Sequence, residues 1–278
     1  MSSSPSPRKI TIFDTTMRDG EMSPNVKFTI PQKVQLAQLL ERMGVDVIEV
    51  GYPGMFEKDL DEVKAVAERI KNPIVCGLAG SKQEEIEKLA SCLGKASRGR
   101  INVFTNVHLA QQSQVIQQDV LSVIGSSVSL ARRYCPDVQW SAFDAIRSEP
   151  DFLCLAVETA IKSGAGTITI PDTLGTIAPG EFVEFLKTLI DRVPNIERAT
   201  LAVHCHDDSG YAVENSLAAL GCGVGQIECS INGLGARRGN ADLRKIVQEV
   251  SKEQKHLVNV DMTLLDEAEV LVAEMTAR

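Results

Sequence analysis

The feature that most constrains the fold is an eightfold alternation of strand-like and helix-like segments. Short runs rich in β-branched residues recur along the chain, and each is followed by a stretch whose apolar residues are spaced near 3.6. The expected strands span residues 9–16, 45–53, 73–80, 100–107, 137–144, 167–173, 200–207 and 226–233. Strands that alternate with helices indicate parallel βαβ units, and eight such units in roughly 250 residues predict the α/β class and a (β/α)8 TIM barrel.

An open, doubly wound sheet is the alternative architecture. Such a sheet usually has fewer strands and a glycine-rich first turn, and this sequence has neither feature. The helix pattern of residues 34–44 ends in Gly44, which suits helix termination. We therefore favour the closed barrel.

The expected barrel domain covers residues 9–255, with a short segment on either side. Residues 1–8 lack an apolar core for a signal peptide, and we interpret them as a disordered lead-in. Residues 256–278 read as a turn followed by one amphipathic helix. Two interpretations of this last segment stay open: a helix that caps the barrel, or a truncated linker to a further domain.

Composition and charge narrow the class of protein. The chain has 278 residues, of which 44% are hydrophobic and 24% charged, and a net charge of −8. An acidic chain without a basic cluster argues against a nucleic-acid partner, and no apolar stretch reaches the ~18 residues of a membrane span. The seven cysteines are scattered without a CxxC pair, which indicates reduced thiols. We expect a cytoplasmic protein that binds neither nucleic acid nor membrane.

Polar residues collect where the expected strands end, which is where barrel enzymes carry their chemistry. His204 and His206 end the seventh strand, and residues i and i+2 of a strand face the same side, so both imidazoles can reach one ion. By itself this pair fits a solvated strand end equally well. Asp14 ends the first strand and Asn240 follows the eighth. The four residues together predict an open oxygen and nitrogen site for a divalent metal ion, namely Mn, Zn, Mg or Fe.

Three further residues near strand ends are candidates for catalysis. Arg18 could stabilise the oxyanion of an enolate or alkoxide, or only pair with Asp19 or Glu21 in its own loop. Glu49, at the end of the second strand, could order Arg18 or form a salt bridge with no catalytic role. His108, just past the fourth strand, could act as an acid or base or touch the substrate, or be a hydrogen-bonded loop histidine.

Four motifs, in this order along the chain, resemble the signatures of the 2-isopropylmalate synthase and homocitrate synthase family. They are F-D-T-T-M-R-D-G-E-x-S-P (13–24), P-D-T-L-G (171–175), H-C-H-D-D (204–208) and N-G-L-G-A-R-x-G-N (232–240). This family is part of a wider group of metal-dependent barrel acyltransferases and lyases, which includes hydroxymethylglutaryl-CoA lyase. The resemblance extends over residues 9–275.

The resemblance implies a Claisen-type condensation of acetyl-CoA with a 2-oxo acid, giving an alkylmalate or a homocitrate-like product. Arg18 would then act on the reacting carbonyl or enolate, and Asp19 would order the first loop and lie at the substrate. Thr173 would hold the carboxylate of the 2-oxo acid. The metal ligands that the resemblance implies are Asp14, His204, His206 and Asn240. Barrels of this family commonly pair, so we expect a homodimer.

The chain departs from the family pattern at residues expected near the substrate. The fifth strand reads S-A-F-D, with Phe143 where the family usually has an acidic residue. The last motif has Ala236 and Arg238 where the family usually has Glu and Ala, which shifts the local charge towards positive. With Phe143 and Arg238 lining the pocket, we predict a more anionic 2-oxo acid, such as a dicarboxylate.

Two alternatives to a synthase stay open. A metal-dependent aldolase or lyase would cleave a C–C bond on the same site, although the lyases typically carry a cysteine in the loop after the last strand and no cysteine follows Cys229. The other alternative is a subunit that needs a partner chain for activity. It is suggested by Phe143, Ala236 and the end of this sequence at Arg278, because the synthases usually continue into further domains.

Overall fold

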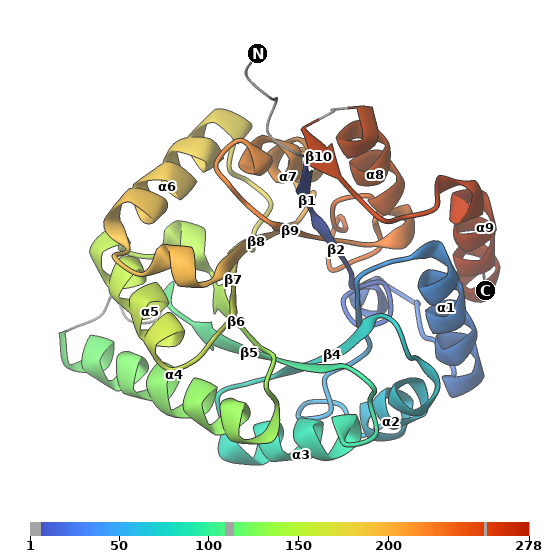
Figure 1. The fold of residues 1–278 in the computed structure, drawn as a ribbon, viewed down its shortest axis with the longest axis horizontal. Helices are drawn as coiled ribbons and strands as arrows, with labels where there is room; N and C mark the ends of the chain where they lie inside the picture. Colours follow the sequence, from blue (N-terminus) through green and yellow to red (C-terminus); the bar gives the residue numbers. More distant parts are fainter. Residues whose placement is uncertain (1–6, 109–113, 253–254, 278) are drawn as a thin grey trace.

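A closed barrel of parallel strands forms the centre of the molecule (Figure 1). The structure is a computed structural model that describes residues 7–108, 114–252 and 255–277; most of the expected lead-in therefore lies outside the described residues. The predicted TIM barrel is confirmed. Seven expected strands contain an observed one, and β5 begins one residue before the expected range of 100–107. The barrel strands are β2 (Thr11–Asp14), β3 (Val47–Glu49), β4 (Ile74–Ala79), β5 (Gly99–Asn106), β6 (Val138–Phe143), β7 (Thr167–Asp172), β8 (Thr200–Cys205) and β9 (Gln226–Cys229).

Helices surround the barrel and cover the outer side of its strands (Figure 1). The first of them begins with a capping box between Thr29 and Gln32 and ends at Gly44, whose φ of 81° suits a residue without a side chain. The helices are α1 (Ile30–Met43), α2 (Asp59–Arg69), α3 (Gln83–Leu93), α4 (Gln114–Tyr134), α5 (Pro150–Lys162), α6 (Pro179–Arg192), α7 (Ala212–Leu220), α8 (Leu243–Lys252) and α9 (Leu265–Thr276).

The last segment of the chain lies against the start of the barrel. β10 (His256–Leu257) pairs in parallel with β1 (Arg8–Lys9), the strand that leads into β2. The helix expected within residues 256–278 is α9, and it packs against α1. None of the helices in the described ranges has both the length and the apolar character that crossing a membrane requires. The seven cysteines are free.

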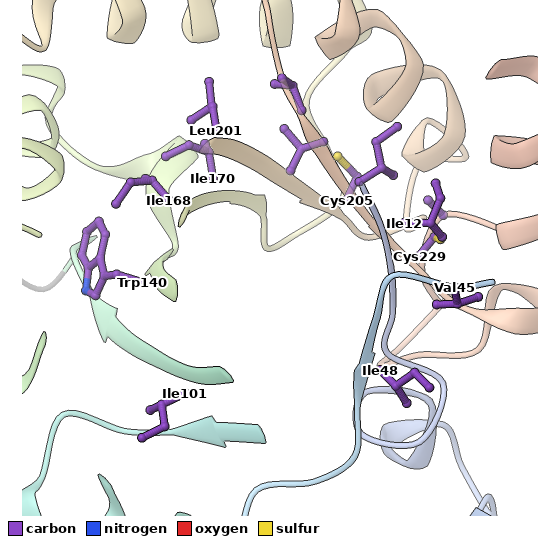
Figure 2. Close-up of a cluster of buried hydrophobic side chains, with 14 of the residues drawn as sticks. Ile12, Val45, Ile48, Ile101, Trp140, Ile168, Ile170, Leu201, Cys205 and Cys229 are labelled. Atoms are coloured by element: carbon purple, nitrogen blue, oxygen red, sulfur yellow. The ribbon is translucent and has the colours of Figure 1, made fainter. Parts of the chain in front are cut away.

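Alternate residues of each barrel strand face opposite sides of its wall. One set packs with the helices in the main hydrophobic core, and Figure 2 shows Ile12, Ile48, Cys205 and Cys229 among these outward-facing side chains. The other set faces the barrel axis, where Phe13, for example, belongs to a separate small apolar cluster. This period of two follows from strand geometry and decides which side chains can reach a site inside the barrel.

Much of the barrel interior is a buried polar network, in contrast to the branched apolar residues that fill many barrels. Arg100 donates from Nη1 to Oε1 of Gln139 (3.2 Å) and to Oε1 of Gln226 (2.8 Å). Gln139 in turn donates from Nε2 to Oε1 of Glu228 at 2.8 Å. All four residues are buried. Because a buried charge needs partners, these contacts hold their side chains in one arrangement along the barrel axis.

The loop that follows β2 is attached to the helical layer by a buried cation. Nζ of Lys33, on α1, lies 3.0 Å from Oε2 of Glu21 and 2.7 Å from Oε2 of Glu62, and it donates to the carbonyl of Val50 at 2.8 Å. The Lys33 side chain is completely buried. It therefore joins the first loop, α2 and the end of β3 at one point.

We predict that Lys33→Met destabilises the protein by about 3 kcal/mol, because it leaves two buried carboxylates short of a cation. Chemical denaturation measures the change in the free energy of unfolding. The matched control is Lys187→Met, which removes an exposed ion pair with Glu184 and should change stability by less than about 0.5 kcal/mol. Equal effects of the two substitutions would contradict the structural role of Lys33.

Candidate active site

A cavity of about 150 Å³ opens where the carboxyl ends of the barrel strands meet. Its polar side includes Arg18, Asp19, His204 and His206, which come from the loop after β2 and from the end of β8. The cavity therefore occupies the end of the barrel at which the sequence predicted the chemistry.

Asp19, His204 and His206 form the group that can hold a metal ion in this cavity. Each offers one ligand atom, and the three atoms lie within 4.8 Å of one another. Nδ2 of Asn240 donates to Oδ2 of Asp19 at 2.6 Å and to the carbonyl of Leu234 at 2.9 Å. The buried Oδ1 of Asn240 has no hydrogen-bond partner. An unsatisfied amide oxygen beside a carboxylate and two imidazoles is the donor set that a divalent cation would complete.

Asp14 does not join this group, and this corrects the ligand set predicted from the sequence. Asp14 is fully buried, and its carboxylate accepts hydrogen bonds from the backbone N (3.1 Å) and from Oγ1 (2.7 Å) of Thr16. It shares the outward-facing side of β2 with Ile12, whereas Thr15 donates to Glu49 on the inner side at 2.6 Å. The alternation of the strand thus turns Asp14 away from the cavity, whose lining does not include it.

The loop after β2 brings Asp19 into the position expected of Asp14. The backbone N atoms of Arg18, Asp19 and Gly20 all donate to the carbonyl of Thr15, at 2.9 to 3.2 Å, so the chain turns tightly over the barrel end. Asp19 was predicted to order the loop and to lie at the substrate; the structure adds that it belongs to the group that could hold a metal ion.

Burial raises the pKa of Asp14 to about 7, from an ordinary value of 3.8. Between these two values the folded protein retains a proton that the unfolded chain has lost, so the free energy of unfolding falls as the pH rises through this window. We predict that metal-free Asp14→Asn gains stability relative to the wild type between pH 5 and pH 7.5, by at most about 1.4 kcal/mol per pH unit. Denaturant titrations at the two pH values measure the difference, and a constant difference would contradict the prediction.

Arg18 is held at the cavity by two carboxylates. Its Nε donates to Oε2 of Glu49 at 2.7 Å, and its Nη1 donates to Oδ1 of Asp19, also at 2.7 Å. Asn102 donates to the other Glu49 oxygen at 3.3 Å, which fixes that carboxylate in turn. Of the partners considered from the sequence, Asp19 and Glu49 contact Arg18, whereas Glu21 pairs with Lys33 and Lys58 instead. Burial by itself would lower the pKa of Arg18, but Glu49 and Asp19 raise it above its ordinary value, so the guanidinium stays charged.

The protonation states of Asp19 and His206 suit the binding of a metal ion. Burial alone would raise the pKa of Asp19, but Arg18 and the two histidines hold it well below its usual range. Burial, reinforced by repulsion from His204, lowers the pKa of His206 to about 4. His206 donates from Nδ1 to the carbonyl of Gly239 at 3.3 Å. A neutral imidazole with Nδ1 protonated has a free lone pair on Nε2, which is the form that binds metal.

Glu228, on β9, orients His204 from the barrel interior. Its Oε2 lies 3.0 Å from Nδ1 of His204, while its Oε1 accepts from Thr169 Oγ1 and Gln139 Nε2, each at 2.8 Å. Burial would lower the pKa of His204, but the hydrogen bond to Glu228 raises it above its ordinary value. The polar network that starts at Arg100 thus ends at His204, a candidate ligand. A carboxylate that hydrogen-bonds the second ring nitrogen of a ligating histidine is common in metal sites.

We predict that Glu228→Gln weakens binding of Mn²⁺ by about 10- to 100-fold, because the amide no longer orients His204 or raises its basicity. Isothermal titration calorimetry of the metal-free protein measures the affinity. The control is Glu249→Gln, which alters an exposed carboxylate paired with Lys252 on α8. An unchanged Mn²⁺ affinity in the Glu228 variant would show that His204 does not need this partner.

Of the other predicted site residues, two line the cavity and two lie outside its lining. Thr173 and Phe143 line the cavity, and Oγ1 of Thr173 accepts from the backbone N of Asp144 at 3.0 Å. His108 is not among the lining residues; its Nδ1 lies 2.9 Å from the carbonyl of Arg147, as a hydrogen-bonded loop histidine would. Arg238 is exposed and also lies outside the lining. The structure therefore supports neither an acid–base role for His108 nor a substrate contact for Arg238.

Several residues that line the cavity were not predicted from the sequence. Glu228, Asn102, Ser141 and Phe104 all line the cavity, and all stand at inward-facing positions of their strands. For Glu228, Asn102 and Ser141 the available signal was a polar residue within a strand, two or four residues from other inward-facing positions; the apolar Phe104 gives no such signal. That signal becomes readable only when one residue of each strand is known to face the barrel axis.

Comparison with known proteins identifies the family of this chain. The model of the HMGL-like family matches residues 9–272. The chain belongs to the HMGL-like family. It is 42% identical over 275 residues to the 2-isopropylmalate synthases of Rhodopseudomonas palustris (strain HaA2) and of Bradyrhizobium sp. (strain ORS 278). Each alignment covers 97% of this chain and 52% of the synthase, so the chain spans about half the length of these relatives.

Solved structures of this family share the fold. The HMG-CoA lyase of Bacillus subtilis superposes with a TM-score of 0.81 at 21% identity, covering 99% of this chain and 96% of the lyase. The hydroxymethylglutaryl-CoA lyase of Pseudomonas aeruginosa gives 0.79 at 20% identity, covering 98% and 95%. At these identities the likeness establishes the barrel architecture of this HMGL-like protein and leaves its reaction to be argued from the site.

Proposed function

We propose that this protein catalyses a divalent-metal-dependent Claisen condensation of acetyl-CoA with a 2-oxo acid. The observation that carries the proposal is the group of Asp19, His204 and His206 in one cavity, with the unpartnered Oδ1 of Asn240 beside it and Arg18 at its edge. The 42% identity to 2-isopropylmalate synthases over 97% of the chain supports the same reaction class.

Asp19, His204, His206 and Asn240 would hold the ion, and their oxygen and nitrogen donors suit Mn, Zn, Mg or Fe. When bound, the ion would act as a Lewis acid towards the ketone of the 2-oxo acid. Glu228 and the carbonyl of Gly239 orient the two imidazoles before any ligand arrives. The two imidazoles are therefore already oriented at the cavity before a metal ion binds.

Arg18 would stabilise the negative charge that develops on oxygen during the reaction. Its guanidinium stays charged and is fixed by Glu49, so it needs no reorganisation when that charge appears. Thr173 would bind the carboxylate of the 2-oxo acid: its Oγ1 accepts from Asp144, which leaves the hydroxyl hydrogen to donate. We assign Glu49 to positioning Arg18 and give no role to His108.

The proposed reaction is a condensation followed by hydrolysis of a thioester. A base removes a proton from the methyl group of acetyl-CoA, and the resulting enolate carbon forms a bond with the ketone carbon of the 2-oxo acid. Water then cleaves the C–S bond of the thioester, which releases CoA as a free thiol and leaves a 2-substituted malate. The alternative function is cleavage of a C–C bond in a hydroxy acid, as a lyase would perform. The fold that this chain shares with HMG-CoA lyases is compatible with it.

We predict that Mn²⁺-loaded protein releases free thiol from acetyl-CoA only when a 2-oxo acid is present. Arg18→Lys should lower kcat by about 10²- to 10³-fold, because a lysine cannot keep the two-carboxylate geometry. Arg42→Lys, at an exposed pair with Glu267, is the control and should leave the rate unchanged. Thiol release is followed with a chromogenic disulfide, and the product is identified by mass spectrometry.

Two results would overturn this proposal. Cleavage of a 2-substituted malate or a hydroxyacyl-CoA without any condensation would assign the protein to the lyases. Activity that appears only on addition of a second chain would support a subunit that needs a partner. Size-exclusion chromatography with light scattering tests the expected homodimer in the same preparation.

A further inference from the structure

We infer that Arg237 is a positioning residue for the proposed ion site. Its side chain holds the loop after β9 against the loops after β7 and β8, and the loop after β9 carries Gly239 and Asn240. The inference rests on the proposed function, because it concerns the same ion site. It adds a residue that does not itself line the cavity and therefore acts through others.

The backbone of the loop after β9 (residues 230–242) is unusual. It contains four residues with left-handed φ values: Asn232 (56°), Gly233 (61°), Arg237 (56°) and Gly239 (101°). Such values suit glycine, whereas a residue with a side chain adopts them at an energetic cost. A conformation of this kind persists where surrounding contacts hold it. At Arg237, the side chain makes such contacts.

The guanidinium of Arg237 joins three loops. Its Nε and Nη2 donate to Oδ1 and Oδ2 of Asp208, at 2.9 and 2.8 Å, which is a bidentate ion pair. Nη2 also donates to the carbonyl of Thr173 at 2.6 Å. Asp208 lies in the loop after β8, and Thr173 lies in the loop after β7. Arg237 thus fixes its own loop relative to both.

Two groups at the ion site depend on the path of this loop. The carbonyl of Gly239 lies 3.3 Å from Nδ1 of His206 and orients that ring. The next residue, Asn240, donates from its backbone N to the carbonyl of Gly233 at 2.9 Å, and its Oδ1 is the unpartnered amide oxygen. A shift of the loop at Arg237 would therefore move both groups.

The loop after β9 is attached on its other side to the loop after β2. In the barrel, β9 pairs with β2 as well as with β8. Oγ of Ser23 donates to the carbonyl of Gly235 at 2.8 Å and accepts from its backbone N at 2.9 Å. Asn240 lies between the two attachments and donates to Asp19. Arg237 supplies the ion pair on the β8 side, so its loss frees the loop on that side.

The test is calorimetric titration of the metal-free protein with Mn²⁺. Arg237→Ala should weaken binding by about tenfold, as the loss of an outer partner of a metal site does. Arg237→Lys should recover little of this, because a lysine cannot form the bidentate pair with Asp208. On charge alone, removal of a cation would strengthen the binding of Mn²⁺. A weaker affinity therefore reports geometry, and a tighter one would overturn the inference.

The matched control is Arg244→Ala. Arg244 also pairs with two carboxylates, those of Asp266 and Glu269, but it joins α8 to α9 outside the cavity lining. This variant loses a comparable set of contacts and should bind Mn²⁺ as the wild type does. An equal loss of affinity in both variants would mean that Arg237 only supports the fold.

Arg237→Gly separates position from stability. Glycine relieves the left-handed backbone, so this variant should unfold at a higher denaturant concentration than Arg237→Ala. It also lacks the ion pair, so it should bind Mn²⁺ no more tightly than Arg237→Ala. Recovery of Mn²⁺ affinity in step with stability would contradict a positioning role for the side chain.

The same titrations distinguish a failure of this inference from a failure of the proposed function. A wild-type protein that binds no Mn²⁺ would overturn the proposed ion site and, with it, the role of Arg237. A wild-type protein that binds Mn²⁺, together with an unchanged affinity in Arg237→Ala, would keep the ion site and overturn the role of Arg237.

Discussion

Closure of the parallel barrel is the constraint on which the rest of this structure depends. Once β2 pairs with both β3 and β9, every barrel strand has an inner and an outer side, and the period of two leaves no freedom over which residue faces which. Outward-facing side chains such as Ile12 and Cys205 pack with the helices. Inward-facing ones, including His204 and Glu228 on the neighbouring strands β8 and β9, contact one another in the buried interior.

Burial explains why the charged side chains of the interior are linked to one another. Arg100 at one level of the barrel reaches Glu228 through Gln139, and Glu228 reaches His204. Each charged side chain in this series is tolerated in the interior because it has a hydrogen-bond partner. Together the contacts fix the orientation of His204, a candidate ligand, relative to the barrel strands. Arg18 and Glu49 form a second such unit. Both units are set before a ligand binds, which is the condition for electrostatic catalysis.

The cavity combines these charged groups with aromatic side chains. Its lining includes Arg18, Asp19 and the two histidines as well as Phe104 and Phe143. Phe143 stands where the family resemblance predicts an acidic residue, and the group of Asp19, His204 and His206 is present without that carboxylate.

Several features of this protein are determined by local sequence. The alternation of strand and helix patterns is repeated eight times, so the barrel could be predicted without tertiary information. The spacing of His204 and His206 put both imidazoles on one side of one strand, and Glu49 could be predicted beside Arg18 because both stand where strands end. These predictions needed only periodicity and the common location of strand ends.

Other features were decided only by the tertiary structure, because they depend on which way a side chain faces and how a loop returns. Asp14 and Asp19 are both carboxylates near the end of β2, and the register of the strand and the turn at Thr15 select Asp19. Arg238 precedes Asn240 by two residues in the sequence, yet it is exposed and does not line the cavity. Which alternate residues of a strand face the barrel axis depends on how the strand pairs with neighbours that are distant in sequence. Local sequence patterns do not contain that information.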